Sequence, residues 1–409
     1  MFGQEMMNVN SAVIKVLGVG GGGCNAVNSM IESNISSAEF IAVNTDNQAL
    51  LLSKANKTLQ IGEKLTKGLG AGSDPNVGEA AAEETKDEIA ALLEGTDLLF
   101  IAAGMGGGTG TGAASVIARI ARELGILTVA VVTKPFSFEG RVRNENANKG
   151  IINLKKYVDT LVVIPNDKLL QYLPAQTGVL DAFKVADDML KQGIVGIVEL
   201  IATPSLINLD FADVNTVMRN QGLAHMGIGR AKGENRVIES VRQAVSSPLL
   251  ETTIEGAKSV ILNVTGGRDL MLNEVSEAAV LVQGIIDASA NIIFGATIDE
   301  SMVDEVKITV IATGFTANSE SESNNDEVKP ILSVKLDVDK KEENVLPLLR
   351  EMEEAEKRAQ EVEEQKIEPI EEVMISDPVV AKMEEELATE PDAKKSRELP
   401  AFMRKLFKK

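Results

Sequence analysis

Glycine clusters twice in this chain, each time directly after a short β-rich apolar run. The first cluster, 18–25, follows the run 13–19; the second, 104–112, follows the run 97–103 and has glycine at six of its nine positions. Glycine lets the backbone approach an anion closely, and the N-terminus of a following helix offers free N–H groups and a positive dipole end. Two such helix starts at one crevice suit a polyphosphate. The alternative is that both clusters serve tight packing of a helix on a strand.

Residues around these clusters extend the prediction. We expect helices to open at Ala26 and at Ala113, and the hydroxyls of Thr109 and Thr111 to act as phosphate donors. A third glycine-rich segment, 68–75, ends in an Asp-Pro pair that suits an N-cap and a first helical position. This segment predicts either a loop that closes over the outermost phosphate or an ordinary helix start.

The first cluster also fits the dinucleotide pattern G-x-G-x-x-G, through Gly18, Gly20 and Gly23, with Asp46 lying 28 residues on. A nicotinamide-dependent oxidoreductase is therefore one alternative. Such a fold has no need of the second cluster, and the chain contains no G-x-x-x-x-G-K-[ST] sequence of a P-loop NTPase.

Composition excludes several other classes. The formal net charge is −20 and aromatic residues make up 3% of the chain, which argues against nucleic-acid binding. A single cysteine, Cys24, excludes an intramolecular disulfide. A single histidine, His225, excludes a multi-histidine metal site and argues against a Ser-His-Asp hydrolase. No secretory signal is evident at 1–10, and charged residues interrupt the apolar stretch 113–132. We expect a soluble protein of a reducing compartment, with no metal held by protein side chains alone.

Alternating strand and helix patterns predict an α/β fold with a parallel sheet covered on both faces. The expected strands are 13–19, 40–45, 97–103, 126–132 and 160–164. A long helical pattern over 179–201 then joins a second, smaller α/β region with strands near 223–228, 258–264, 291–298 and 305–313 and helices near 234–246 and 273–289.

These patterns and the glycine distribution set the expected domain boundaries. All 34 glycines lie at or before Gly314, and a strongly acidic segment follows. We expect a nucleotide-binding domain at 1–177, a connecting helix at 178–202, a second α/β domain at 203–317, a flexible acidic linker at 318–392 and a basic tail at 393–409. Within the linker, 348–367 has a weak heptad pattern that fits a lone charged helix or a short coiled coil.

The sequence 106–112, Gly-Gly-Gly-Thr-Gly-Thr-Gly, resembles the signature of the tubulin/FtsZ family, and the similarity runs from about Ala12 to Phe315 and returns in the last dozen residues. The resemblance implies a tubulin-like fold with a Rossmann-type GTPase domain. It also implies a cytoskeletal enzyme that hydrolyses GTP to GDP and phosphate, polymerises head to tail and forms the division ring at mid-cell in the bacterial cytoplasm. A tubulin-like protein that binds but does not hydrolyse nucleotide is an alternative, which the acidic residues Asp210 and Asp213 argue against.

The resemblance also assigns nucleotide contacts by position. It implies phosphate contacts from the two glycine clusters, at Gly20, Gly21, Gly22, Asn25, Gly107, Gly108, Thr109 and Gly110. It places the third segment near the γ-phosphate, through Ala71, Gly72 and Ser73. It assigns ribose and phosphate contacts to Glu139 and Arg143, and guanine recognition to Asn166, Phe183 and Asp187. From the pattern alone, Asp187 and Asp188 would be ordinary solvated helix charges.

The catalytic residues implied by the resemblance lie after the long helix. By itself the pair Asp210 and Asp213 fits helix capping. In the family this loop enters the nucleotide pocket of the next subunit, where the two carboxylates polarise the attacking water and Asn208 contacts nucleotide. Mg²⁺ then neutralises phosphate charge. A requirement for a monovalent cation such as K⁺ is left open.

The basic tail 397–409 resembles the peptide with which this family docks membrane-tethering and regulatory division proteins such as FtsA or SepF. Its residues Leu399, Phe402, Met403, Leu406 and Phe407 form one apolar helical face. Such a face fits a partner groove or an anionic membrane surface. We favour the groove, and so expect membrane contact to be indirect.

Overall fold

The structure is a computed structural model that describes residues 12–33, 35, 37–170, 176–202, 207, 210–246, 254, 256–286 and 289–315. The predicted acidic linker, 318–392, and the predicted basic tail, 393–409, therefore lie outside the described residues, as does Asn208. None of the helices in the described part of the chain combines the length and the apolar character that a membrane span needs.

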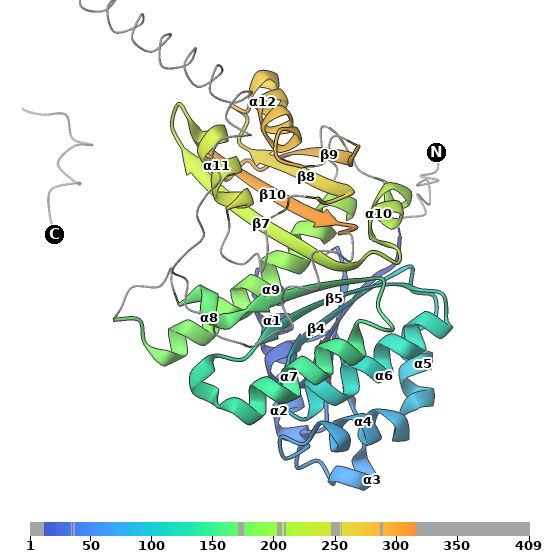
Figure 1. Ribbon diagram of the computed structural model, residues 1–409. Helices are drawn as coiled ribbons and strands as arrows, with labels where there is room; N and C mark the ends of the chain where they lie inside the picture. Colours follow the sequence, from blue (N-terminus) through green and yellow to red (C-terminus); the bar gives the residue numbers. More distant parts are fainter. Residues whose placement is uncertain are drawn as a thin grey trace, which may run out of the picture. The chain divides into compact units, whose positions relative to one another are not determined.

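The described strands form one ten-stranded sheet in the order β3-β2-β1-β4-β5-β6-β7-β10-β8-β9 (Figure 1). All pairs from β3 to β7 are parallel, β10 is antiparallel to both of its neighbours, and β8 and β9 are parallel to each other. The strands are β1 Ile14–Val19, β2 Glu39–Asn44, β3 Lys57–Gln60, β4 Leu98–Gly104, β5 Leu127–Lys134, β6 Thr160–Pro165, β7 Gly222–Lys232, β8 Ser259–Gly266, β9 Asn291–Ile298 and β10 Glu305–Thr313.

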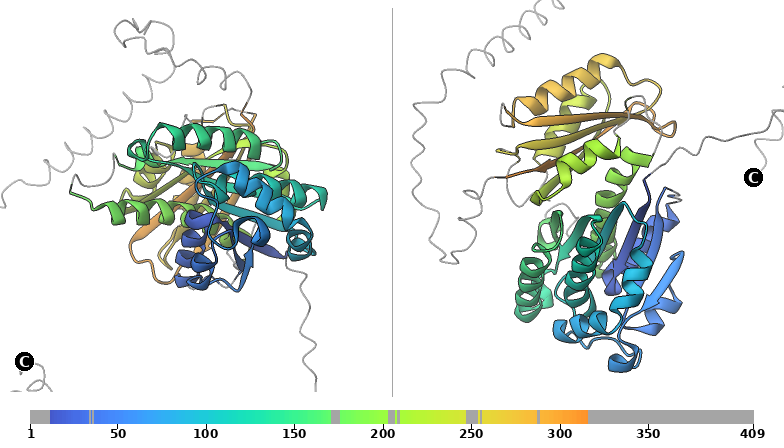
Figure 2. Two further views of the ribbon diagram at one scale, coloured as in Figure 1. Left: turned by 90° about the horizontal axis from the view of Figure 1, so that it is seen from below. Right: turned by 90° about the vertical axis from the view of Figure 1, so that its right-hand side faces the viewer.

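Helices cover both faces of the parallel part of the sheet, as the sequence predicts (Figures 1 and 2). In the first half of the chain they are α1 Gly20–Glu32, α2 Asn47–Leu51, α3 Glu63–Thr66, α4 Pro75–Glu84, α5 Lys86–Leu93, α6 Thr109–Glu123, the 3₁₀ turn η1 Ser137–Glu139, α7 Arg141–Leu154 and α8 Asn166–Leu169. The later helices are α9 Val179–Ala202, α10 Phe211–Met218, α11 Arg236–Val245 and α12 Leu272–Gln283.

Two cores follow from the period-2 alternation of the strands. Val16 belongs to a core on one face that includes side chains of α1, α9 and α10, whereas its neighbour Leu17 belongs to a core on the other face with side chains of α4, α5, α6 and α7. The first core also contains Ile261 of β8 and Ile311 of β10, so α9 shares a core with both halves of the sheet. A third core lies between α11, α12, β8 and β10.

Two helix starts and one helix end differ from the sequence prediction. α1 begins at Gly20, not Ala26, and α6 begins at Thr109, not Ala113, so part of each glycine cluster is already helical. Glycine has a low helix propensity, but at Gly20, Gly23 and Gly112 neighbouring backbone lies too close for a β-carbon. α12 ends at Gln283, before the predicted 289. The short elements β3, α2, α3, η1 and α8 and the longer α5 and α7 were not predicted.

Candidate functional site

Three glycine-rich segments meet at the carboxyl ends of the parallel strands. A β-carbon added to Gly20, at the start of α1, would lie 2.7 Å from the backbone nitrogen of Gly110 in α6. One added to Gly108 would lie 2.8 Å from the β-carbon of Ala71 and 3.0 Å from the nitrogen of Asp74. These contacts bring all three predicted segments together. Ligands of open α/β sheets bind at this edge.

The glycines divide into packing positions and open positions. A β-carbon on Gly23 would lie 2.2 Å from the carbonyl oxygen of Ala102, and one on Gly112 would lie 2.0 Å from that of Pro75. At these positions the packing interpretation is correct. In contrast, a β-carbon on Gly21 or Gly72 would meet nothing within 4 Å. The packing explanation therefore holds at some glycines, and only the open ones are available for the predicted approach of an anion.

The open positions expose uncapped helix amides. Gly21, Gly22 and Asn25 are exposed in the first turns of α1, and neither α1 nor α6 has a side-chain hydrogen bond at its N-cap or an acidic residue in its first turn. Free N–H groups and the positive ends of two helices consequently face one crevice. By contrast, α4 is capped, because the Asp74 side chain accepts from the nitrogen of Asn76.

The hydroxyls of Thr109 and Thr111 hold the loop together. Thr111 is 3% exposed, and its Oγ1 accepts a hydrogen bond of 2.8 Å from the nitrogen of Gly106. Thr109 is 9% exposed, and its Oγ1 lies 2.7 Å from Oγ1 of Thr45. Thr111 thus shapes the signature loop, and its predicted role as a phosphate donor gains no support from the structure. Thr109 remains at the margin of the crevice.

The next segment brings a cation to the signature loop. The carboxylate of Glu139 accepts from the nitrogen of Phe136 at 2.9 Å and pairs with Arg143 at 3.0 Å. Arg143 in turn has a guanidinium nitrogen 4.0 Å from where a β-carbon on Gly107 would lie. Glu139 therefore positions Arg143, whose side chain is half exposed beside the loop.

An aromatic cluster lies beside the start of α9. Phe183 is 38% exposed and meets Phe136 edge to face, at a centroid distance of 5.4 Å. Phe138 stacks on Phe136 at 5.1 Å and is 62% exposed. The sequence prediction named only Phe183, although Phe136 and Phe138 lie in the same segment as Glu139 and Arg143. At the start of α8, Asn166 is buried, and its Oδ1 has no hydrogen-bond partner among the described residues.

Asp187 and Asp188 of α9 differ in their surroundings. Asp188 pairs with Lys191 at 2.7 Å and accepts from the Ser29 hydroxyl at 3.4 Å. Asp187 has no ion-pair partner among the described residues, and both line a hollow of about 410 Å³ that also includes Asn25 of α1. Burial, and then the charge of Asp188, raise the pKa of Asp187 to about 7. Asp187 is therefore a desolvated acceptor without a counter-ion, facing the glycine helix.

The acidic pair Asp210 and Asp213 lies elsewhere. Both are exposed at the start of α10, where Oδ1 of Asp210 accepts from the nitrogen of Asp213 at 2.7 Å. At the other end of α10, the carbonyl of Met218 accepts from the hydroxyl of Thr160, the first residue of β6. This contact fixes α10 at the amino ends of the parallel strands, opposite the crevice (Figure 1). The capping interpretation of the pair holds within one chain.

The remaining residues discussed from the sequence have structural roles. Burial raises the pKa of the Cys24 thiol to about 11, and the residue is 3% exposed. Asp46 caps α2 through the nitrogens of Gln48 and Ala49. His225 is buried in β7, where its ring meets Phe315 edge to face.

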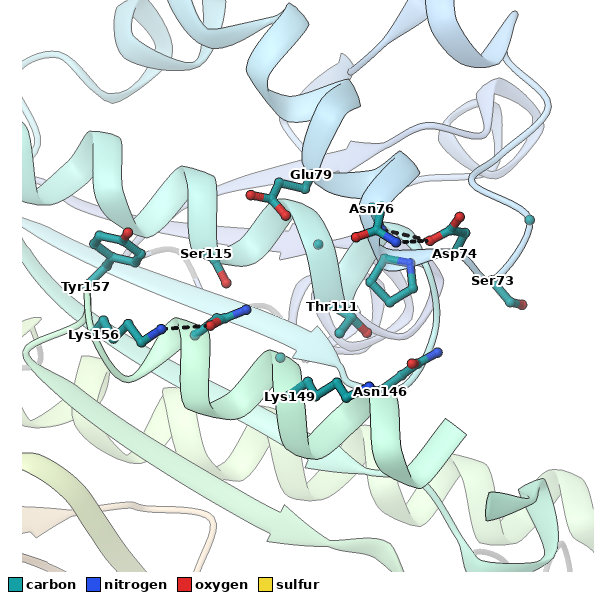
Figure 3. A pocket seen from close by; sticks show the side chains of 15 residues that line it. Ser73, Asp74, Asn76, Glu79, Thr111, Ser115, Asn146, Lys149, Lys156 and Tyr157 are labelled. Carbon is teal, nitrogen blue, oxygen red and sulfur yellow. Dashed lines mark hydrogen bonds between the residues drawn. The ribbon is translucent and has the colours of Figure 1, made fainter. Parts of the chain in front are cut away.

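A second hollow opens beside the third glycine segment and was not predicted (Figure 3). It has a volume of about 520 Å³ and lies between α4, α6 and α7. In Figure 3, Ser73 and Asp74 stand at one end, and Lys156 and Tyr157 stand at the other. Gly72 and Ser73 border this hollow as well, so it is adjacent to the crevice.

The fold and the converging glycine segments define a tubulin-like GTPase. Residues 13–174 match the model of the GTPase domain of the tubulin/FtsZ family, and residues 222–316 match that of the FtsZ family C-terminal domain. FtsZ from M. jannaschii, solved as an empty dimer, is 48% identical with a TM-score of 0.72; the match covers 74% of this chain and 88% of that one.

The chain belongs to the tubulin/FtsZ family, and it is a GTPase of the FtsZ type. This assignment removes the oxidoreductase alternative. Two Haloferax volcanii structures share the fold at lower identity. A GTPγS-bound protofilament of CetZ2 is 20% identical, with a TM-score of 0.66, and the match covers 76% of this chain and 96% of that one. A GDP-bound monomer of CetZ1 is 22% identical, with a TM-score of 0.66 over 75% and 95% of the chains.

Proposed function

We propose that the crevice at the carboxyl ends of β1 and β4 binds GTP and GDP through the residues assigned from the sequence. The observation that supports this most strongly is the convergence of three glycine-rich segments on two uncapped helix N-termini. Backbone amides at the starts of α1 and α6 hold the phosphates, and Gly72 and Ser73 approach the outermost one. Arg143, held by Glu139, adds a positive charge beside Gly107.

Guanine is recognised in this proposal by Asp187, Asn166 and Phe183. The N1–H and exocyclic amine of guanine donate as a pair to a carboxylate, and adenine cannot supply both donors. Lys184 and Lys191 line the same hollow but pair with Asp181 and Asp188, so Asp187 has no ion-pair partner among the described residues. Asn166 Oδ1 has no hydrogen-bond partner among them either. Asp187→Ala should abolish the preference for GDP over ADP in a titration. Asp188→Ala is the matched control at the ion-paired neighbour, and it should keep the preference for GDP over ADP.

Hydrolysis requires a second copy of the chain in this proposal. Asp210 and Asp213 are exposed at the amino edge of the sheet, whereas the crevice lies at the carboxyl edge. A head-to-tail repeat brings the acidic pair of one subunit, with Asn208, to the crevice of the next and builds a filament. The dimer of M. jannaschii FtsZ and the CetZ2 protofilament support self-association.

An exposed leucine patch beside the crevice also supports a docked neighbour. It comprises Leu51, Leu52, Leu65 and Leu69, which are 78%, 80%, 50% and 83% exposed. The nitrogen of Asn47 donates to the carbonyl of Gly68, which ties α2 to the third glycine segment. Contiguous exposed apolar side chains mark interaction surfaces. A subunit seated over the crevice would cover them.

Mg²⁺ fits this crevice as a partner of the nucleotide. Among the described residues no group of three or more His, Cys, Asp or Glu side chains could hold a metal ion, and Asp46 and Asp74 serve as helix caps. Mg²⁺ is ordinarily held by substrate phosphates, waters and one or two carboxylates. It would neutralise phosphate charge, while the protein supplies position and the acidic pair orients water.

Mixed assembly tests the shared site. A β-carbon on Gly21 meets no neighbouring atom within 4 Å, so Gly21→Glu should place a carboxylate in the crevice, block phosphate binding and leave the fold intact. Asp213→Ala removes an acid but leaves the crevice. Each variant alone should lack turnover, and an equimolar mixture should recover a substantial part of the wild-type phosphate release. A mixture as inactive as its parts contradicts the proposal.

We further propose that these filaments build the division ring at mid-cell and that the tail 397–409 docks adaptor proteins such as FtsA or SepF, with indirect membrane contact. This part rests on the family assignment and on the apolar face of the tail sequence. Deleting 397–409 should leave GTP turnover unchanged and abolish ring localisation in cells. Tight binding of the tail peptide to anionic vesicles would favour direct membrane contact.

A further inference from the structure

The buried hydroxyl of Thr45 lies behind the signature loop and was not singled out from the sequence. Thr45 follows β2, is 0% exposed, and has its Oγ1 2.7 Å from Oγ1 of Thr109. Among the described residues this is the hydrogen-bond partner of the Thr45 hydroxyl. A buried hydroxyl must give its hydrogen to an acceptor or lose that hydrogen bond outright. The geometry therefore offers Thr109 as the acceptor.

Thr109 connects this hydroxyl to the crevice. It is the first residue of α6, and its β-carbon lies 3.4 Å from the position that a β-carbon on Gly20 would occupy. A threonine hydroxyl has one hydrogen to donate and two lone pairs to accept with. When Thr45 donates to Thr109, the hydrogen of Thr109 is free for a group in the crevice.

We propose that Thr45 is a positioning residue for nucleotide phosphate, acting through Thr109. A bound phosphate oxygen accepts from Thr109, and Thr109 accepts from Thr45, so the two hydroxyls point in one direction. Hydrogen bonds in such a chain polarise one another, and the bond to an anion is the stronger kind. This inference rests on the proposed function, because it takes the crevice to be the phosphate site.

The backbone of Thr45 serves the third glycine segment independently. The Oγ1 of Thr66 shares its hydrogen between the carbonyl of Gly62 at 3.0 Å and that of Thr45 at 3.3 Å, and it accepts from the nitrogen of Gly68 at 3.3 Å. Thr45→Val has nearly the same shape and keeps the carbonyl. It therefore removes only the bond to Thr109, and the link to Thr66 stays.

GDP titration of dilute protein tests the inference without turnover or assembly. Thr45→Val should bind GDP about tenfold more weakly than wild type, which corresponds to about 1.4 kcal/mol, as expected for a hydrogen bond that supports an anion contact. Thr45→Ser keeps the hydroxyl and should bind within about twofold of wild type. The matched control is Thr128→Val: Thr128 is 0% exposed, donates to the carbonyl of Ile126 at 3.1 Å, and lies at the amino end of β5.

A double-mutant cycle separates positioning from general destabilisation. If Thr45 acts through Thr109, then Thr45→Val combined with Thr109→Val should bind GDP no more weakly than Thr109→Val alone. Additive losses, or a loss in Thr45→Ser as large as that in Thr45→Val, would overturn the inference. If Thr45→Val does not fold, Thr45→Ala against Thr45→Ser gives the same contrast. Wild-type affinity in both Thr109→Val and Gly21→Glu would instead refute the phosphate site itself.

Discussion

In the proposed guanine site, the half-buried carboxyl of Asp187 should make nucleotide binding depend on pH near neutrality. Its pKa is raised to about 7, first by burial and then by the charge of Asp188. Only the carboxylate form accepts both guanine donors. With a pKa of about 7, roughly one-eleventh of the free protein is ionised at pH 6 and roughly ten-elevenths at pH 8. Affinity for GDP should thus be about tenfold weaker at pH 6 than at pH 8.

The assay is calorimetric titration of nucleotide-free protein with GDP at fixed ionic strength from pH 6 to pH 8. Phosphate groups also titrate near pH 6, so Asp187→Asn serves as the reference variant. The ratio of wild-type to Asp187→Asn affinity removes the phosphate contribution and should rise about tenfold. Asp188→Asn should shift the transition to lower pH, because the Asp188 charge contributes to the raised pKa.

The same carboxyl affects stability in the opposite direction. Without nucleotide, the folded protein keeps the Asp187 proton up to about pH 7, whereas the unfolded chain releases it near the ordinary value of 3.8. Its contribution to folding therefore becomes unfavourable as pH rises through this window. Asp187→Asn should melt above wild type at pH 8, with a smaller difference at pH 5. An affinity ratio that stays constant between pH 6 and pH 8 would refute the assignment of Asp187 as the guanine acceptor.

Three further predictions concern other parts of the molecule. Arg236 is buried and forms ion pairs with Glu274 and Asp269. Arg236→Met should therefore lower the free energy of unfolding, measured in urea, by about 3–5 kcal/mol. Arg242→Met, at an exposed ion pair, is the control and should cause almost no change. The Cys24 thiol is buried and has a pKa of about 11. It should react with a disulfide reagent at least about a hundredfold more slowly in the folded protein than in urea, and equal rates would show that the thiol is accessible. Asp210→Ala should lose both turnover and about 1 kcal/mol of capping stability, whereas Asp210→Asn should keep the cap and still lose turnover; full activity of Asp210→Asn would contradict a catalytic carboxylate.

The sequence predicted the strands well because their apolar runs report burial directly. The expected strands 291–298 and 305–313 coincide with β9 and β10. The starts of α1 and α6 were placed too late because glycine usually breaks helices. Here the backbone of Ala102 lies so close to Gly23 that a helix can pass only without a side chain, a tertiary constraint that no local propensity records.

The candidate site was less predictable in its details. Asp187 and Asp188 are adjacent on α9, and the pattern cannot show that Ser29 and Lys191 engage only Asp188. Thr45 shows the same difficulty, because its role depends on a contact with a residue 64 positions away. Sequence patterns show which residues can donate or accept; long-range packing determines which of them are already engaged.

The topology of the sheet explains why catalysis should depend on a neighbouring subunit. β6 has six residues and so spans about 20 Å. The carboxyl end of α10 is fixed at the amino end of β6, because Thr160 donates to the carbonyl of Met218. Asp159 holds Asn220 and Gly222 just beyond the helix. Bringing Asp213 to the crevice of its own chain would break these contacts. A second copy, stacked in the same direction, can present its amino edge to the carboxyl edge of the first without any such rearrangement. GTP turnover per subunit should accordingly rise with protein concentration. A specific activity that stays constant down to dilutions at which the protein is strictly monomeric would contradict this, because Asp210 and Asp213 would then act within their own chain or would not be needed for hydrolysis.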